Sequence, residues 1–171
     1  VFHLSEDELK FSNDGQEFTE SNIEAICRFG YSDKDKQSDN IGKFGIGFKS
    51  VYSITDTPII NSGKHYFKIE NYIIPREHPG HGYNNGSEFI LPFNHKKMPK
   101  VDSFNLLDSE LSSFNARVLL FLENLKAVVL KTPTLSCEVL KNVNKINGYP
   151  NISRVTVSIN QGENTEEEHF L

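Results

Sequence analysis

The stretch GKFGIGFKS, residues 42–50, decides how this sequence is interpreted. Its three glycines let the backbone approach a ligand closely, and the apolar spacing of Phe48, Val51 and Tyr52 predicts a helix directly after them. A helix that starts after such a loop directs free N–H groups and the positive end of its dipole at the loop. The arrangement therefore predicts a phosphate site, and hence a nucleotide site.

The spelling of this stretch differs from both common phosphate-binding loops. Dinucleotide-binding folds use G-x-G-x-x-G, whereas Gly42, Gly45 and Gly47 are spaced G-x-x-G-x-G. The Walker A loop is G-x-x-x-x-G-K-[ST], and here Phe48 stands between the last glycine and Lys49. One extra residue rotates the lysine by about 100° around a helix, so Lys49 should point away from bound phosphates. A glycine-rich turn before a core helix is the alternative interpretation.

The length and composition fit one domain, or one domain with a piece of a second. The chain has 171 residues, of which 37% are hydrophobic and 24% charged, with a net charge of −5 and no long basic run. No apolar run reaches the roughly 20 residues that span a bilayer, and Cys27 and Cys137 match no metal or redox spacing. We therefore expect no metal site, no membrane contact, no direct nucleic-acid partner and a reducing, cytoplasmic location.

Hydrophobic periodicity predicts the elements around the glycine-rich stretch. Phe18, Thr19 and Ile23 suit a helix with a threonine N-cap inside a hydrophobic staple. An apolar stripe over residues 107–125 predicts one core helix. Strands are predicted at residues 59–60, 66–69, 88–91, 127–130, 137–140 and 155–159.

Two further motifs flank the glycine-rich stretch. Asn13-Asp14-Gly15 ends a predicted strand and precedes a helix, and Gly86-Ser87 enters another strand. In this order, the three motifs resemble those of the GHKL (Bergerat-fold) ATPases, and their spelling is closer to the sacsin-type, heat-shock-chaperone-like branch. The stretch LLFLENLK, residues 119–126, also looks like bacterial members of that branch. The resemblance covers roughly residues 1–130.

The resemblance implies a role for each matching residue. The Asn13 side-chain oxygen would accept a hydrogen bond from the adenine amino group, at a position where the family usually has aspartate. Gly15 would let the backbone pass close to the base, and Ser87 would place a hydroxyl near it. Backbone N–H groups of the glycine-rich stretch would hold the phosphates, with residues 31–40 as a lid. The full expected nucleotide-binding set is Asn13, Asp14, Gly15, Gly42, Lys43, Phe44, Gly45, Ile46, Gly47, Phe48 and Ser87.

The resemblance implies no catalytic residue within this chain. In the family, the glutamate that activates water and the asparagine that binds Mg²⁺ lie on a helix upstream of the first motif. Only twelve residues precede Asn13, and among them Glu6, Asp7 and Glu8 fit a polar turn. ATP or ADP is thus the expected ligand, with Mg²⁺ only through upstream residues, and we expect the isolated chain to hydrolyse ATP poorly.

The expected fold is an α+β two-layer sandwich, a mixed sheet covered on one face by helices (the Bergerat fold). Residues 1–130 would form the nucleotide-binding module, lacking its N-terminal helix, and residues 131–171 would begin a β-rich extension of a larger protein. Its other domains and a second copy of the chain are the expected protein partners. Three functions stay open: an ATPase module that drives conformational change, a non-hydrolysing nucleotide-sensing or interaction module, and a structural domain whose glycines serve packing.

Overall fold

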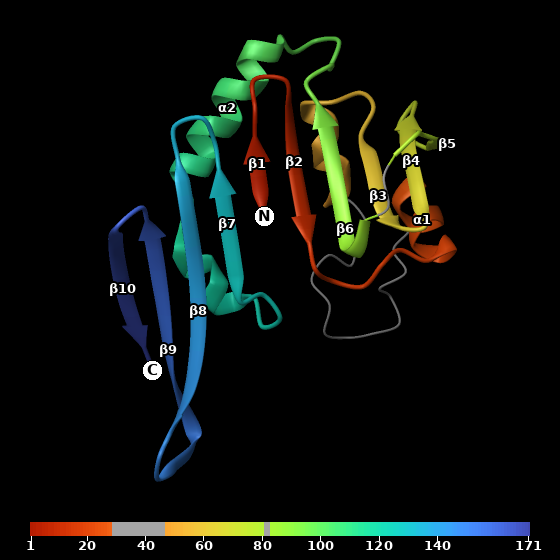
Figure 1. The fold of residues 1–171 in the computed structure, drawn as a ribbon. Coiled ribbons are helices and arrows are strands. Elements are labelled where there is room, and N and C mark those ends of the chain that lie inside the picture. The colour runs from red at the N-terminus through yellow and green to blue at the C-terminus, as the bar shows by residue number, and fades with distance from the viewer. Residues whose placement is uncertain (29–46, 81–82) are drawn as a thin grey trace. The chain divides into compact units, whose positions relative to one another are not determined.

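The computed structural model describes residues 1–28, 47–80 and 83–171. The chain divides into two compact units, Ser5–Asn105 and Val1–Leu4 with Leu106–Leu171. Each unit is built mainly of β-strands (Figure 1). The expected boundary near residue 130 stays a prediction.

The Ser5–Asn105 unit contains an antiparallel sheet of five strands in the order β2-β6-β3-β4-β5. The strands are β2 (Glu8–Asn13), β3 (Ile59–Gly63), β4 (His65–Glu70), β5 (Ile74–Glu77) and β6 (Tyr83–Pro92). Two short helices, α1 (Glu20–Cys27) and the 3-10 helix η2 (Phe48–Ser53), pack against this sheet. Their apolar side chains meet a core that includes the fully buried Ile60 and Ile69.

Helix α1 begins at the predicted N-cap, Thr19. The Thr19 side chain accepts from the backbone N–H of Asn22, and the Asn22 side chain accepts from the backbone N–H of Thr19. This capping box satisfies N–H groups that the first helical turn leaves without intrahelical partners. The prediction of a threonine cap is therefore confirmed.

The other unit has the strand order β10-β9-β8-β7-β1. Its strands are β1 (Phe2–Leu4), β7 (Ala127–Lys131), β8 (Ser136–Ile146), β9 (Tyr149–Gln161) and β10 (Asn164–Phe170). β1 pairs with β7 in parallel, and the other pairs are antiparallel. β8 and β9 form a long hairpin that extends past β7 and β10 (Figure 1).

The core of this unit lies between the sheet and the chain that follows α2 (Lys100–Ser112). Leu119, from the 3-10 helix η3 (Ala116–Phe121), is fully buried against Leu130, Val139 and Val157. The buried positions along β7 and β8 alternate, as expected for strands with one covered face.

The six strand segments predicted from the sequence are confirmed, because each lies inside an observed strand. The predicted α+β two-layer sandwich is nevertheless wrong. The structure describes ten strands in mixed sheet, whereas its two α-helices have only 8 and 13 residues. The difference arises because residues 136–170 add three long strands, and because much of the apolar periodicity taken as helical belongs to short 3-10 turns.

The predicted core helix over residues 107–125 is also wrong. Helix α2 ends at Ser112, and a separate 3-10 helix starts after Asn115. The Asn115 side chain accepts from the backbone N–H of Arg117 at 3.1 Å. Serine and asparagine side chains compete for backbone groups in this way and so favour helix ends over helix interiors.

Candidate functional site

The first motif, Asn13-Asp14-Gly15, lies at the end of strand β2. The Asn13 Oδ1 atom accepts from the backbone N–H of Gly15 at 3.0 Å, which holds the chain in a tight turn. All three residues are exposed. The side chains of Asn13 and Asp14 are therefore accessible to a ligand from solvent.

The register between β2 and β6 joins the first motif to the third. Asn13 lies directly opposite Ser87, and Phe11 lies opposite Phe89 with the two rings stacked 4.4 Å apart. Because side chains alternate along a strand, Asn13 and Ser87 share the sheet face that carries this aromatic pair. Two motifs far apart in the sequence are thus brought together in the Ser5–Asn105 unit.

Gly86 permits this close approach. Its φ is +108°, and a Cβ atom there would lie 2.9 Å from both the Asn13 carbonyl carbon and the Asp14 Cα, and closer still to the Asn13 carbonyl oxygen. Real Cβ atoms essentially never approach other atoms so closely. Glycine is therefore required at this position by both backbone angle and space.

Ser87 is buried, and its hydroxyl oxygen lies 2.7 Å from that of Ser62 on β3. Ser62 also accepts from the backbone N–H of Phe18 at 2.8 Å and lies 3.1 Å from the Gly86 carbonyl oxygen. A hydroxyl has one proton to donate, so Ser62 donates either to Gly86 or to Ser87. Through these hydrogen bonds the two serines connect Phe18, which follows the first motif, to β3 and β6. Ser87 therefore stabilises the strand opposite Asn13.

The sequence did not identify Ser62 as a site residue. The one local indication that Ser62 is buried is its spacing from Ile60, because alternate strand residues point to the same face and Ile60 is fully buried. A serine at such a position needs hydrogen-bond partners. Those partners come from distant segments, and the local sequence contains no sign of them.

The described end of the glycine-rich stretch lies against the same sheet face. Gly47 is the N-cap of η2, and the Phe48 ring lies 6.0 Å from that of Phe89 and 6.2 Å from that of Tyr52. A Cβ atom on Gly47 would meet no described atom within 4 Å, and its φ is −56°. Neither packing among the described residues nor backbone angle requires glycine at position 47.

The remaining residues of the glycine-rich stretch lie outside the described part of the chain. They are Gly42, Lys43, Phe44, Gly45 and Ile46, and the expected lid at residues 31–40 lies outside it as well. Their assignments to the phosphates and to the lid stay predictions.

Lys49 connects η2 to two neighbouring segments through hydrogen bonds to backbone carbonyls. Its ammonium group donates to the carbonyl oxygen of Ile26 at 2.8 Å and to that of Tyr72 at 3.0 Å. Burial lowers the pKa of Lys49, an effect that the nearby Cys27 opposes. Both carbonyls belong to residues outside the glycine-rich stretch, and the expected turn of Lys49 away from bound phosphates stays a prediction.

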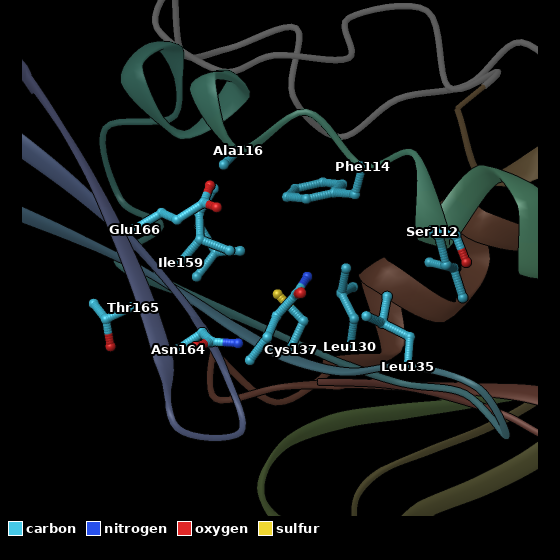
Figure 2. Close-up of a pocket in the computed structure, with 13 residues that line it drawn as sticks. Ser112, Phe114, Ala116, Leu130, Leu135, Cys137, Ile159, Asn164, Thr165 and Glu166 are labelled. Carbon is cyan, nitrogen blue, oxygen red and sulfur yellow. The ribbon is translucent and has the colours of Figure 1, made fainter.

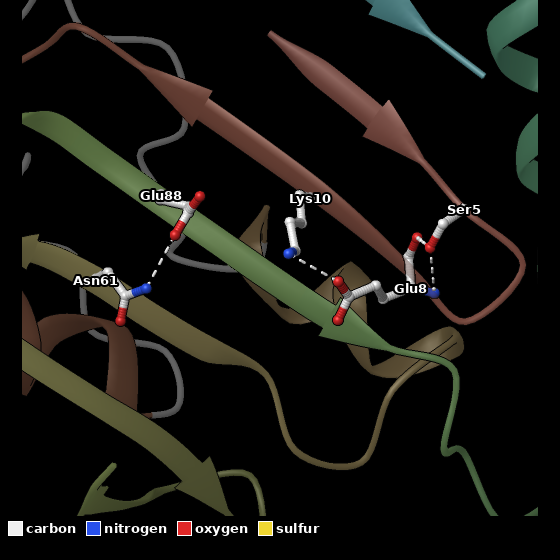
Figure 3. Close-up of polar contacts among 5 residues, drawn as sticks. All are labelled: Ser5, Glu8, Lys10, Asn61 and Glu88. Atoms are coloured by element: carbon white, nitrogen blue, oxygen red, sulfur yellow. Dashed lines mark hydrogen bonds and ion pairs between the residues drawn. The ribbon is translucent and has the colours of Figure 1, made fainter. Parts of the chain in front are cut away.

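The opposite face of the sheet carries polar pairs (Figure 3). The Asn61 amide nitrogen donates to the Glu88 carboxylate at 2.9 Å, and Glu8 forms an ion pair with Lys10 at 3.0 Å. Asp7 is also paired, with Lys100. Glu8 and Asp7, two of the acids that precede Asn13, thus form ion pairs at the surface.

Within residues 1–28, 47–80 and 83–171, no group of three or more histidine, cysteine, aspartate or glutamate side chains could hold a metal ion. In the same described residues, no helix is long and apolar enough to cross a bilayer.

Comparison with known proteins adds a family relationship. Residues 4–75 match the sacsin domain family. The chain is 30% identical to Protein NO VEIN of Arabidopsis thaliana over 137 residues, which covers 67% of this chain and 5% of that protein. It is 48% identical to sacsin of Homo sapiens over 52 residues, which covers 30% of this chain and 1% of sacsin. The matches relate this chain to the sacsin-type proteins, of which it spans a small part.

Proposed function

We propose that this sacsin-related chain is an ATP-binding module of the GHKL kind. It would couple nucleotide binding and hydrolysis to conformational change in a larger cytoplasmic protein, with ATP or ADP, the remaining domains and a second copy as its partners. The observation that carries the proposal is the register of β2 and β6, which sets Asn13 opposite Ser87.

Asn13 is suited to an adenine amino group. Its side chain is exposed, and its Oδ1 atom uses one lone pair on the Gly15 N–H at 3.0 Å. An amide oxygen has two lone pairs, so the second can accept from the base. The same bond to Gly15 fixes the direction of the oxygen before a ligand arrives, which lowers the entropic cost of binding.

Gly47 supports the phosphate assignment against the interpretation that the glycines serve packing. No described atom lies within 4 Å of the place where its Cβ would be. Glycine without a packing or angular requirement is explained by a ligand that approaches the backbone. Gly42 and Gly45 complete the spacing in the sequence.

A second candidate is a non-hydrolysing nucleotide sensor, and Asn13 favours it. An amide in place of the usual carboxylate gives an adenine bond without charge assistance. The two candidates share the binding site and differ only in hydrolysis.

The test is a thermal-shift experiment with ATP and ADP on the natural chain, on Asn13→Ala and on Asn105→Ala. Asn105 is an exposed helix residue, so its substitution is a matched control. A ligand present at about 100 times its dissociation constant stabilises a protein by about 2.7 kcal/mol. We therefore expect a rise of several degrees in the natural chain and in Asn105→Ala, and a smaller rise in Asn13→Ala.

No shift at millimolar nucleotide in the natural chain would overturn the proposal. Phosphate release measured on the larger protein, with the residues upstream of this chain, distinguishes the two candidates, because the isolated chain should hydrolyse ATP poorly in either case. Steady release indicates the ATPase, and binding without release indicates the sensor.

A further inference from the structure

A cavity of about 380 Å³ lies in the unit that contains residues Leu106–Leu171, where no function has been assigned (Figure 2). Its floor is apolar and includes Leu130, Cys137, Val139 and Ile159. Phe114 and Leu135 line its sides, and Gln161, Asn164 and Glu166 contribute polar groups from the β9–β10 hairpin. The surface that lines the cavity is polar and apolar in similar measure, and the volume lies near the lower end of the usual range for small-molecule sites.

Two glutamates on β10 differ in their partners. Glu166 lies opposite Ile159 and Glu168 lies opposite Val157, so both carboxylates are on the sheet face that covers the core. Glu168 makes a bidentate pair with Arg117, with both N···O distances 2.8 Å. Glu166 has no hydrogen-bond or ion-pair partner among the described residues, although it lines the cavity.

The surroundings of Glu166 suit a cation with an apolar body. Figure 2 shows the Glu166 carboxylate and the Phe114 ring directed over the cavity, with Ile159 and Cys137 beneath them. Glu166 is exposed, so its carboxylate attracts a cation with the modest strength of a surface group, and an aromatic face adds a cation–π attraction.

We propose that this cavity binds a small organic cation, an ammonium group joined to an aromatic or branched alkyl body. The ammonium group pairs with Glu166, as the Arg117 guanidinium pairs with Glu168, and the body fills the space between Phe114, Leu135 and the apolar floor. The binding is independent of the proposed nucleotide site, because every residue of this cavity belongs to the other unit.

The test uses 2-phenylethylammonium, titrated into the natural chain and followed by isothermal calorimetry. Two probes of similar shape, 2-phenylethanol and 3-phenylpropionate, replace the cation with a neutral group and with an anion. We expect the ammonium to bind with millimolar or tighter affinity, the alcohol more weakly and the carboxylate not measurably.

Two variants test whether the Glu166 carboxylate is the group that binds the ammonium. Glu166→Gln should weaken ammonium binding by about three- to five-fold, the range expected for an exposed ion pair. Glu163→Gln, in the turn of the same hairpin but outside the cavity lining, should leave the affinity unchanged. Equal binding of the ammonium and the alcohol, or equal affinity of Glu166→Gln and the natural chain, would overturn the proposal.

The two free thiols locate the ligand. Cys137 lies in the cavity floor, whereas Cys27 is buried in the other unit. Bound ammonium should slow the alkylation of Cys137 by a maleimide and leave Cys27 unaffected, as mass spectrometry of the two peptides can show. Binding that protects neither thiol would place the cation elsewhere and contradict the assignment.

Discussion

Replacement of Gly86 by alanine tests the close approach of β6 to the first motif. Gly86 has a φ of +108°, and an added Cβ would lie 2.9 Å from the Asp14 Cα and closer to the Asn13 carbonyl oxygen. The neighbouring atoms are backbone and cannot rotate away. The strand must therefore shift, and the Asn13 turn must move with it.

The magnitude follows from two costs. Alanine at a positive φ costs about 1–2 kcal/mol, and the overlap with a packed backbone costs about 1–3 kcal/mol more. We therefore expect Gly86→Ala to lower the free energy of unfolding by about 2–5 kcal/mol. It should also weaken nucleotide binding, because Asn13 is displaced.

Gly63→Ala is the matched control within the same unit. Gly63 also has a positive φ, +52°, but its Cβ would meet only the exposed side chain of Glu17, with the carboxyl carbon at 2.7 Å. That flexible side chain can rotate away. We expect this control to lose only the backbone term, about 1–2 kcal/mol.

Urea unfolding followed by tyrosine fluorescence measures both variants. The chain has no tryptophan, and five of its six tyrosines belong to the Ser5–Asn105 unit. The fluorescence signal therefore reports mainly on that unit. Midpoints at an unchanged slope give the difference in stability. If Gly86→Ala lies within about 0.5 kcal/mol of Gly63→Ala, the reasoning about the Asn13 contact is refuted.

Three further predictions concern the same unit. Ser62→Ala leaves the half-buried N–H of Phe18 without its acceptor and the buried Ser87 hydroxyl without its partner, and should cost about 1–3 kcal/mol; an unchanged unfolding midpoint and unchanged hydrogen exchange at Phe18 would count against this role. Thr19→Ala removes the side-chain half of the α1 cap and should cost about 1 kcal/mol in urea unfolding, whereas no loss would show that Asn22 holds the helix start alone. Burial raises the pKa of Tyr52 above its ordinary value of 10.0, so above that pH the unfolded chain releases a proton that the folded chain keeps, and stability falls. Tyr52→Phe should therefore lose less stability than the natural chain between pH about 9 and about 11, and equal losses in unfolding experiments would contradict the burial of this hydroxyl.

Local patterns predicted the elements that depend on neighbouring residues. The six short segments rich in apolar residues are strands, and residues 155–159 among them alternate in polarity. Thr19 caps α1 because its partner Asn22 is three residues away. The layer of helices was predicted wrongly, because the stripe over residues 107–125 has helical spacing, while the side chains of Ser113 and Asn115 bond to backbone groups where α2 ends and η3 begins. Apolar spacing alone does not report such competition for backbone hydrogen bonds.

The local structure at the candidate site was predicted where its motifs are local, whereas its ligand contacts stay predictions. The turn at Asn13 and the entry of Ser87 into a strand could be recognised from composition, and the structure makes them register partners. Ser62 could not be found in this way, because its contacts with Phe18 and Gly86 join three separate segments. The strain at Gly86 likewise depends on the approach of β2, which a single segment does not encode.

Gly47→Ala tests most directly whether the glycine-rich stretch binds the phosphates of ATP or ADP. No described atom lies within 4 Å of the new methyl group, and the φ of −56° suits alanine, so the fold should tolerate the change. Calorimetric titration with ADP should then show saturable binding to the natural chain and at least about ten-fold weaker binding to Gly47→Ala, with equal urea midpoints. Equal ADP affinity in the two proteins, or no binding of ADP to the natural chain at millimolar concentration, would contradict the account.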